Sequence, residues 1–225
     1  MKAQLIDGKR ISAEIKAEAA EEAAALKAKG ITPCLAVVLV GDDSASQVYV
    51  NNKKKACEAV GIRSVSHVLS GGTTEEALLE LIAKLNADRD IHGILVQMPV
   101  PKQIDERKVI LAIDPKKDVD CFHPVNVGNL HTGGEGFLPC TPAGIIELIK
   151  RSGHSIEGKQ CVVIGRSNIV GKPVAMLLMQ ENGTVTICHS KTKNLAEICR
   201  GADIIVSAVG KVNTVTADMV KEGAI

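Results

Sequence analysis

The sequence predicts an α/β protein of two domains, and three observations predict it. Short, continuous apolar runs rich in valine and isoleucine recur at 35–41, 161–165 and 203–210, as is typical of parallel strands buried on both faces. Segments with helical spacing alternate with these runs, as in strands joined by right-handed crossover helices. The length of 225 residues is enough for two modest hydrophobic cores.

The first half of the chain predicts an αβα domain with a parallel sheet. After the apolar run at 35–41, a helix is expected with Ser44 as its N-cap and Gly61 as its stop. Thr73 and Glu76 fit a capping box that begins the next helix. The expected elements are a first helix rich in Ala, Glu and Lys, strands at 35–41, 63–69 and 92–101, and helices at 44–61, 73–88 and 105–112.

The pattern resumes in the second half after a stretch rich in Gly, Pro and Asp at 114–140. Such an irregular segment predicts either a functional loop or a connection between domains. A helix follows at 141–153, with Thr141 as its N-cap and Pro142 at its first position. We therefore expect domains at 1–140 and 141–225. The remaining expected elements are strands at 161–165, 184–188 and 203–210 and helices at 171–182 and 194–200.

Composition argues against a nucleic-acid partner. The 27 basic and 26 acidic residues give a formal charge of +1, so no global basic field is present. The chain has one tyrosine, two phenylalanines and no tryptophan, too few to stack bases along a single strand.

Cysteine usage and hydropathy predict a cytoplasmic protein that holds no metal. The seven cysteines are scattered, odd in number and without a CxxC pair, which argues against a disulfide framework and a zinc site. His131 and His189 lack partners at metal-ligand spacing. No run approaches the roughly 18 apolar residues of a membrane span, and the N-terminus lacks the apolar core of a signal peptide.

The segment CVVIGRSNIVGKPVAMLLM (161–179) has the strand–turn–helix layout of a Rossmann-like domain. A tight turn at Gly165 and close packing at Gly171 would aim a helix N-terminus at a pyrophosphate. Ser167 replaces the second glycine of the usual pattern, and the last gap is one residue longer. An ordinary αβ turn is the alternative. The candidate cofactor residues are Gly165, Arg166, Ser167, Ile169, Gly171, His189 and Ser190.

The end of the second strand of this domain favours NADP over NAD. An NAD enzyme usually places an acidic residue about 20 positions after the first glycine, but CHSKTK (188–193) has no acid and two lysines. Together with Arg166, these residues would cradle an additional phosphate. The alternative is that His189, Ser190 and Lys191 form a solvated loop.

The only tyrosine, Tyr49, precedes Lys53 by four residues in SQVYVNNKKKA (46–56). On a helix the two share a face, and the nearby charges of Lys54 and Lys55 favour loss of a proton from Lys53. Such a lysine can move protons while a tyrosine hydroxyl orients water or a substrate nitrogen. The alternative is a surface lysine that packs against the ring.

The chain resembles the bifunctional methylenetetrahydrofolate dehydrogenase/methenyltetrahydrofolate cyclohydrolase family from its N-terminus to residue 225. The resemblance is carried by ordered blocks: SQVYVNNKKKA, GILVQMPVP, PKKDVDCFHPVNVG, PCTPAG, GRSNIVGKPVAMLL and TVTICHSKT. It implies NADP-dependent oxidation of methylenetetrahydrofolate, then hydrolysis of the methenyl product to formyltetrahydrofolate. It also implies one cleft for both steps, a folate-binding catalytic first domain, a homodimer, and a place in one-carbon metabolism and purine biosynthesis.

The resemblance assigns roles within the first domain. Lys53 would activate water or relay a proton, Tyr49 would assist it, and Gln97 would hydrogen-bond Lys53 and set its ionisation. Asp120 would bind the amidine-like edge of the pterin. The implied substrate-binding residues are Ser46, Tyr49, Lys53, Val96, Gln97, Met98 and Asp120.

Residue types alone leave alternatives open. Gln97 could satisfy backbone groups at a strand end, Asp118 or Asp120 could cap a turn, and His123 receives no role. Another two-domain NADP oxidoreductase, such as one like shikimate or amino-acid dehydrogenases, and a non-catalytic folate- or nucleotide-binding module are the competing functions.

Two departures from the family pattern stand out. Cys121 follows DVD where a glycine is common. The last residues, EGAI (222–225), resemble a turn and the first two residues of a further strand, whereas family members continue with a strand, a Gly/Pro-rich loop and a helix. We therefore expect the sequence to be a piece of a longer protein.

Overall fold

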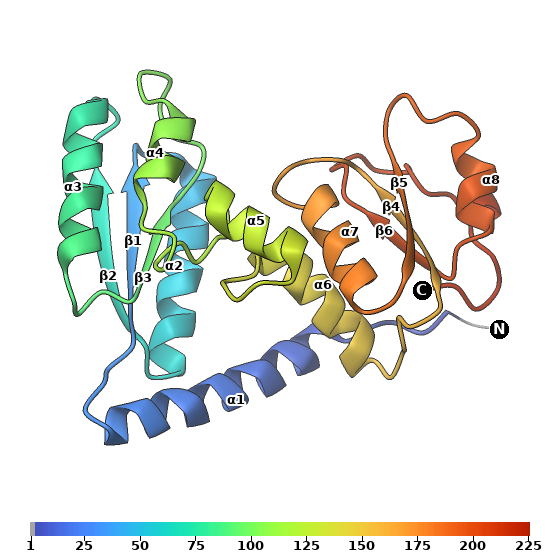
Figure 1. The fold of residues 1–225 in the computed structure, drawn as a ribbon, viewed down its shortest axis with the longest axis horizontal. Helices are drawn as coiled ribbons and strands as arrows, with labels where there is room; N and C mark the ends of the chain where they lie inside the picture. Colours follow the sequence, from blue (N-terminus) through green and yellow to red (C-terminus); the bar gives the residue numbers. More distant parts are fainter. Residues whose placement is uncertain (1–2) are drawn as a thin grey trace. The chain divides into compact units, whose positions relative to one another are not determined.

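The computed structural model describes residues 3–225 apart from the side chain of Ala45. The chain forms two compact units, each coloured by sequence in Figure 1. The N-terminal unit consists of residues 12–126, and the described part of the C-terminal unit combines residues 3–11 with residues 127–225. The expected α/β class with two parallel sheets is confirmed. The functional boundary near residue 140 stays a prediction.

The N-terminal unit is a three-stranded parallel sheet in the order β2-β1-β3 with helices on both faces (Figure 1). Alternate residues of β1 pack to opposite sides: Val38 lies in the core under α3 and α4, while Val37 packs with Val50 of α2. Both faces are covered, which is why β1 reads as one unbroken apolar run. The elements are α1 (Gly8–Ala28, most of it in this unit), β1 (Cys34–Val40), α2 (Ser44–Ala59), β2 (Arg63–Leu69), α3 (Glu75–Ala87), β3 (Gly93–Val96) and α4 (Glu106–Ala112).

The C-terminal unit repeats this architecture with a parallel sheet in the order β5-β4-β6 (Figure 1). Val163 of β4 packs with α6 and α7, whereas Val162 packs toward α8 and η1. This doubly wound layout is the one expected for the second domain. The elements are α5 (Pro124–Thr132, most of it in this unit), α6 (Cys140–Arg151), β4 (Gln160–Ile164), α7 (Gly171–Gln180), β5 (Thr184–Cys188), α8 (Leu195–Arg200), β6 (Ile204–Ser207) and η1 (Ala217–Met219).

The predicted N-caps Ser44, Thr73 and Thr141 are wrong by one or two positions. The observed caps are Asp43, Thr74 and Pro139. At α2, the Asp43 carboxylate accepts a hydrogen bond from the backbone N–H of Ser46 at 2.8 Å. Two capping residues stand next to each other at both α2 and α3, and the backbone conformation rather than the residue type decides between them.

The irregular stretch expected at 114–140 contains a helix that the prediction missed, α5 (Pro124–Thr132). Gly128 and two asparagines lower its helix propensity, so the segment reads as a loop. The start of this helix could have been predicted from Pro124, because proline favours the first position of a helix. The predicted strand at 92–101 is likewise shorter, since β3 ends at Val96.

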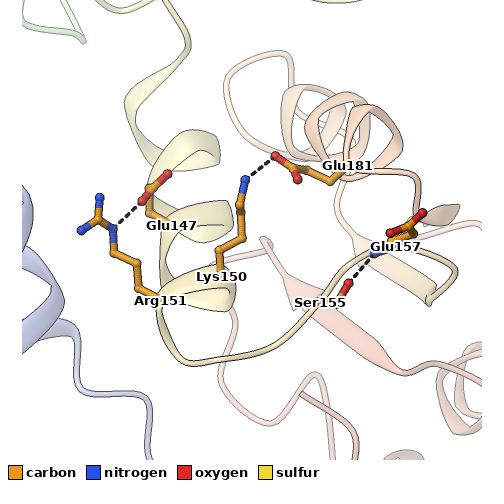
Figure 2. A network of polar contacts seen from close by, with 6 residues as sticks. All are labelled: Glu147, Lys150, Arg151, Ser155, Glu157 and Glu181. Atoms are coloured by element: carbon orange, nitrogen blue, oxygen red, sulfur yellow. Dashed lines mark hydrogen bonds and ion pairs between the residues drawn. The ribbon is translucent and has the colours of Figure 1, made fainter.

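Two residues of α6 in the C-terminal unit, Lys150 and Arg151, form partly exposed ion pairs (Figure 2). Lys150 Nζ lies 2.9 Å from Glu181 Oε1, just after α7, and Arg151 Nε donates to Glu147 Oε2 at 2.6 Å. Both pairs are partly exposed, so each contributes at most about 1 kcal/mol to stability. The buried aliphatic side chains beneath them hold α6 and α7 on the sheet.

The last residue of the chain pairs with β6. Ile225 donates its N–H to the carbonyl of Asp203 at 2.8 Å and accepts from the N–H of Ile205 at 2.8 Å. This is the bonding pattern of one residue in a parallel ladder.

Candidate active site

Lys53 and Gln97 meet at the carboxyl ends of the strands in the N-terminal unit. α2, which carries Lys53, follows β1, and Gln97 is the first residue after β3. Lys53 Nζ donates to Gln97 Oε1 at 3.1 Å across 44 positions of sequence. Ligands of open parallel sheets bind at this edge.

The carboxamide of Gln97 is held by its surroundings. Its backbone N–H donates to the carbonyl of Val38 at 2.8 Å, one step beyond the end of β3. Its Nε2 donates to the carbonyl of Met98 at 2.9 Å, which directs Oε1 toward Lys53. Gln97 thus bonds both to a backbone carbonyl and to Lys53, and its catalytic role stays a prediction.

Asp120 is a half-buried carboxylate without a hydrogen-bond donor. It makes no hydrogen bond to any other residue within 3–225. Burial raises its pKa, the positive charge of Lys53 lowers it, and the negative charge of Asp118 raises it. A desolvated carboxylate with both oxygens unoccupied is suited to accept two N–H bonds from a ligand.

The structure separates the roles of the two aspartates of DVD. Asp118 is 2% exposed, and its Oδ2 accepts from the backbone N–H of His123 at 2.8 Å and from Nδ2 of Asn126 at 3.0 Å. Asp118 is thus the residue that caps a turn. Asn126 is 3% exposed, and sequence reasoning missed it; its signal was an asparagine between valines in HPVNVG.

The other predicted substrate residues lie on the same elements with different exposure. Tyr49 is on α2 and 63% exposed, while Ser46 is buried in the first turn of that helix. The side chain of Val96 is 3% exposed and packs in the core with α3 and α4. Val96 can therefore offer a ligand only its main chain, whereas Met98 is half-buried beside that core.

The glycine turn of the C-terminal unit is packed so closely that a side chain at either glycine would collide with the backbone. Gly165 has φ +126°, and a Cβ there would lie 2.6 Å from the carbonyl oxygen of Ala208. A Cβ on Gly171 would overlap the carbonyl oxygen of Gly165. Only glycine allows the turn and the start of α7 to approach this closely.

Ser167 occupies the place of the second glycine and makes its own contacts. Its Oγ accepts from the backbone N–H groups of Val170 and Gly171, both at 3.2 Å. The hydroxyl thus satisfies donors at the N-terminus of α7. Arg166 and Ile169 are exposed on the same turn, and the Arg166 guanidinium bonds to no other residue among 3–225.

A second turn, after β5, begins beside the glycine turn. Gly165 donates its N–H to the carbonyl of Cys188 at 2.8 Å. In the turn that follows, His189 donates its N–H to Thr192 Oγ1 at 2.8 Å, and His189 Nδ1 accepts from the N–H of Lys191 at 3.1 Å. The loop is ordered by these bonds, and Ser190 is exposed on it.

A cavity of about 730 Å³ also lies in the C-terminal unit, beside the last residues of the chain. Its walls are residues 3–7 and 220–225 together with Arg10, Arg151, Ser152 and His154. No predicted site residue lines it, so it is separate from the glycine turn.

Among residues 3–225, no three His, Cys, Asp or Glu side chains gather in a way that could hold a metal ion. No helix in this range combines the length and apolar character needed to cross a membrane.

Two family models match the chain, one over each half. Residues 6–120 match the tetrahydrofolate dehydrogenase/cyclohydrolase catalytic domain. Residues 139–225 match the NAD(P)-binding domain of the same family. The two matches together span most of the chain.

Individual relatives agree with these models. Bifunctional protein FolD of Agathobacter rectalis is 60% identical over 223 residues, which are 99% of this chain and 80% of that protein. The crystal structure of bifunctional FolD from Campylobacter jejuni is 52% identical, with a TM-score of 0.96 over 99% of this chain and 79% of that one. FolD from Trypanosoma brucei, solved with NADP and an inhibitor, is 41% identical, with a TM-score of 0.93 over 100% of this chain and 77% of that one.

Proposed function

This chain belongs to the tetrahydrofolate dehydrogenase/cyclohydrolase family, and from that premise we propose that it oxidises methylenetetrahydrofolate with NADP and hydrolyses the methenyl product to 10-formyltetrahydrofolate. The observation that carries the proposal is the Lys53–Gln97 hydrogen bond at 3.1 Å, made beside an unpartnered carboxylate, Asp120. A two-domain oxidoreductase that acts on other substrates has no need for Lys53, Gln97 and Asp120 together.

Asp120 binds the folate in this proposal. The pterin presents an amidine-like edge with two N–H donors, and a carboxylate offers the matching pair of acceptors. Because Asp120 has no donor among the described residues, both oxygens are available. Ser46, Tyr49, Met98 and the main chain of Val96 complete the proposed substrate site.

Lys53 serves the hydrolytic step. Water adds to the cationic methenyl carbon and must lose a proton, and the ring nitrogen that departs from the carbon must gain one. A neutral amine is compatible with the cationic intermediate, whereas a fixed positive charge opposes it. Gln97 holds the lysine Nζ in place, and Tyr49 orients water from the same helix face.

The residues after β4 and β5 fit NADP. Gly165 and Gly171 allow the tight turn after which α7 begins, and a pyrophosphate binds at the N-terminus of this helix in the proposal. Arg166, Ser190 and His189 stand on adjoining turns, and no acidic residue follows β5 to repel a phosphate on the ribose. When bound, NADP accepts the hydride from the methylene carbon of the folate.

A substrate panel tests the proposal. Purified protein is assayed with methylenetetrahydrofolate and NADP, with methenyltetrahydrofolate alone, and with shikimate and several amino acids. We expect turnover of the two folates only. Turnover of hydroxy or amino acids without folate activity would favour another NADP oxidoreductase. Calorimetric binding of folate without turnover would favour a non-catalytic binding module.

Arg166 provides a separate test of the cofactor. Replacement of Arg166 with Ala should weaken NADP binding by roughly 10-fold or more, since a charged hydrogen bond to phosphate is lost. NAD binding should change little, because NAD lacks that phosphate. Lys211→Ala, an exposed cation on the loop after β6, is the control, and equal losses for the two cofactors would refute the phosphate contact.

We further infer a cytoplasmic homodimer with a folate-binding catalytic domain at 1–140 and an NAD(P)-binding domain at 141–225, acting in one-carbon metabolism for purine biosynthesis. None of the seven cysteines is paired in a disulfide, which supports a reducing compartment. Sedimentation equilibrium tests the dimer, and a mass equal to 23.7 kDa would contradict it.

A further inference from the structure

The segment that carries Asp120 is anchored at its start. Lys117 Nζ donates to three backbone carbonyls at the end of α3, those of Leu85, Asn86 and Asp88, at 2.7–3.0 Å. Its own carbonyl accepts from the N–H of Ile94 in β3 at 2.7 Å. The segment therefore runs alongside β3 as a short parallel bridge, with Asp118 opposite Ile94.

A close contact fixes the middle of the segment. A Cβ on Gly93 would lie only 2.6 Å from Cγ1 of Val119, so the glycine lets Val119 approach the sheet. Val119 also packs with the core on the α2 side. Val119 is thus held against the sheet between the two aspartates.

The end of the segment is held by buried polar groups. Asn126 Nδ2 donates both to Asp118 Oδ2 at 3.0 Å and to the carbonyl of Pro115 at 2.8 Å. The N–H of His123 donates to the same Asp118 oxygen, and the N–H of Cys121 bonds to the Asp118 carbonyl at 3.3 Å. Asp120 therefore lies inside two nested turns, 118–121 and 118–123, and both are closed by a bond to Asp118.

We propose that Asp118, with Asn126 as its partner, is a positioning residue that fixes the turn on which Asp120 meets the folate. Asp120 itself has no donor among the described residues, so its position depends on the main chain of the turn. A buried carboxylate with two N–H donors is a stable anchor because loss of either side leaves a buried polar group unsatisfied. The inference rests on the proposed function.

The experiment compares variants that differ in whether the bonds between residues 118, 123 and 126 can form. Asp118→Ala removes the bonds to His123 and Asn126. Asp118→Asn keeps one acceptor oxygen at the same position and so retains both bonds. Asn126→Ala removes one donor and is the milder alternative if Asp118→Ala does not fold. The control is Asp105→Ala, which removes a carboxylate that caps α4 by accepting from the N–H of Arg107 at 2.8 Å and that makes no bond to the segment 117–126.

We expect Asp118→Ala or Asn126→Ala to raise KM for methylenetetrahydrofolate roughly 10- to 100-fold, because a small displacement of a binding group has such an effect. Asp118→Asn should stay within about threefold of the wild type, since an isosteric acceptor preserves the geometry. Asp105→Ala should lower the melting temperature without a change in KM. A merely structural role would reduce the amount of active enzyme and leave KM unchanged, so equal KM values in all variants would overturn the proposal.

Hydrogen exchange of the free protein gives a readout that does not depend on activity. The amides of Cys121 and His123 should lose protection in Asp118→Ala and keep it in Asp118→Asn. Unchanged protection in Asp118→Ala would show that Asp118 does not hold the turn and would refute the inference. A wild type that binds no folate would instead refute the proposed function, so the two failures are distinguishable.

Discussion

Lys53 differs from the two lysines that follow it by one contact. Its Nζ bonds to Gln97 at the end of β3, whereas Lys54 lies at 4.0 Å from Glu58 on the exposed face of α2. Lys55 is exposed as well. Three residues of the same type and near-identical sequence context therefore have different environments, and only the first is joined to the strand ends.

Lys53→Met should reduce hydrolysis of methenyltetrahydrofolate by about 100-fold or more, which is the usual contribution of a group that transfers protons. A thioether of similar length keeps the packing but cannot exchange protons. The loss of methenyl absorbance measures the rate. Lys54→Met is the matched control and should hydrolyse at the wild-type rate, while an undiminished rate in Lys53→Met would remove Lys53 from the mechanism.

Asp120 should destabilise the folded protein at neutral pH. Burial raises its pKa above the ordinary value, so between those two pKa values the folded state binds more protons than the unfolded state. The free energy of unfolding from this group therefore falls as the pH rises through that window. Asp120→Asn should be more stable than the wild type at pH 7 and unable to bind folate.

The difference should vanish at about pH 3, where an aspartate is protonated in both states. Urea denaturation at the two pH values measures it. Asp118→Asn is the variant with which the stability of Asp120→Asn is compared. It removes the negative charge of Asp118, which raises the pKa of Asp120, and it leaves Lys53 in place. If Asp120→Asn stabilised the protein equally at low pH, the destabilisation would not come from the raised pKa of Asp120.

Cys121, the residue after Asp120, has a backbone conformation that residues other than glycine rarely adopt. It has φ +57°, in the left-handed region, where a side chain costs about 1 kcal/mol or more relative to glycine. The turn around Asp118 holds it there. This conformation gives a physical reason for the glycine that is common at this position in the resembled family.

At the scale of elements, the β4–α7 turn depends on two glycines for different reasons. Gly165 needs a positive φ, and Gly171 needs the absence of a Cβ so that α7 can begin against the turn. Each requirement follows from backbone approach, so neither is visible in hydrophobic periodicity.

Gly171→Ala should weaken NADP binding and lower stability by about 1–3 kcal/mol, because the new methyl group overlaps main-chain atoms that must shift. Folate binding to the N-terminal unit should be less affected. Gly144→Ala in α6 is the control: nothing lies within 4 Å of its Cβ, and alanine should stabilise the helix by up to about 1 kcal/mol. Thermal unfolding and cofactor titration measure both effects, and equal behaviour of the two variants would contradict the close-approach argument.

Strand starts were predicted within one residue, because a buried parallel strand must be apolar on both faces. Helix starts were less accurate: Asp43 and Ser44 are both good caps, and only one has the required backbone conformation. The helix α5 was missed because its asparagines and Gly128 favour loops. Packing of Leu130 into the C-terminal core stabilises this helix, whose intrinsic helix propensity is low.

At the scale of the whole molecule, aliphatic packing rather than aromatic residues or ion pairs stabilises both units. Only three aromatic residues of the Phe, Trp and Tyr types occur, one Tyr and two Phe. The buried clusters on the two faces of each sheet consist mainly of Val, Ile, Leu and Ala. Their burial is the main favourable contribution to folding.

Leu178→Ala should therefore destabilise the C-terminal unit by about 2–5 kcal/mol, since this fully buried side chain leaves a cavity. Lys150→Ala breaks the partly exposed pair with Glu181 (Figure 2) and should cost less than about 1 kcal/mol. Urea denaturation compares the two. A larger effect for the lysine would mean that the surface pairs, and not the core, hold α6 and α7.

The sequence by itself determined the two parallel sheets, the glycine turn and the pairing of Tyr49 with Lys53 on one helix face, because these follow from periodicity and residue type within short segments. Tertiary structure alone decided that Gln97 reaches Lys53, and that Asp118 is an anchor while Asp120 is left without a donor. Those distinctions depend on which groups distant segments bring together and shield from water, and local sequence does not encode that proximity.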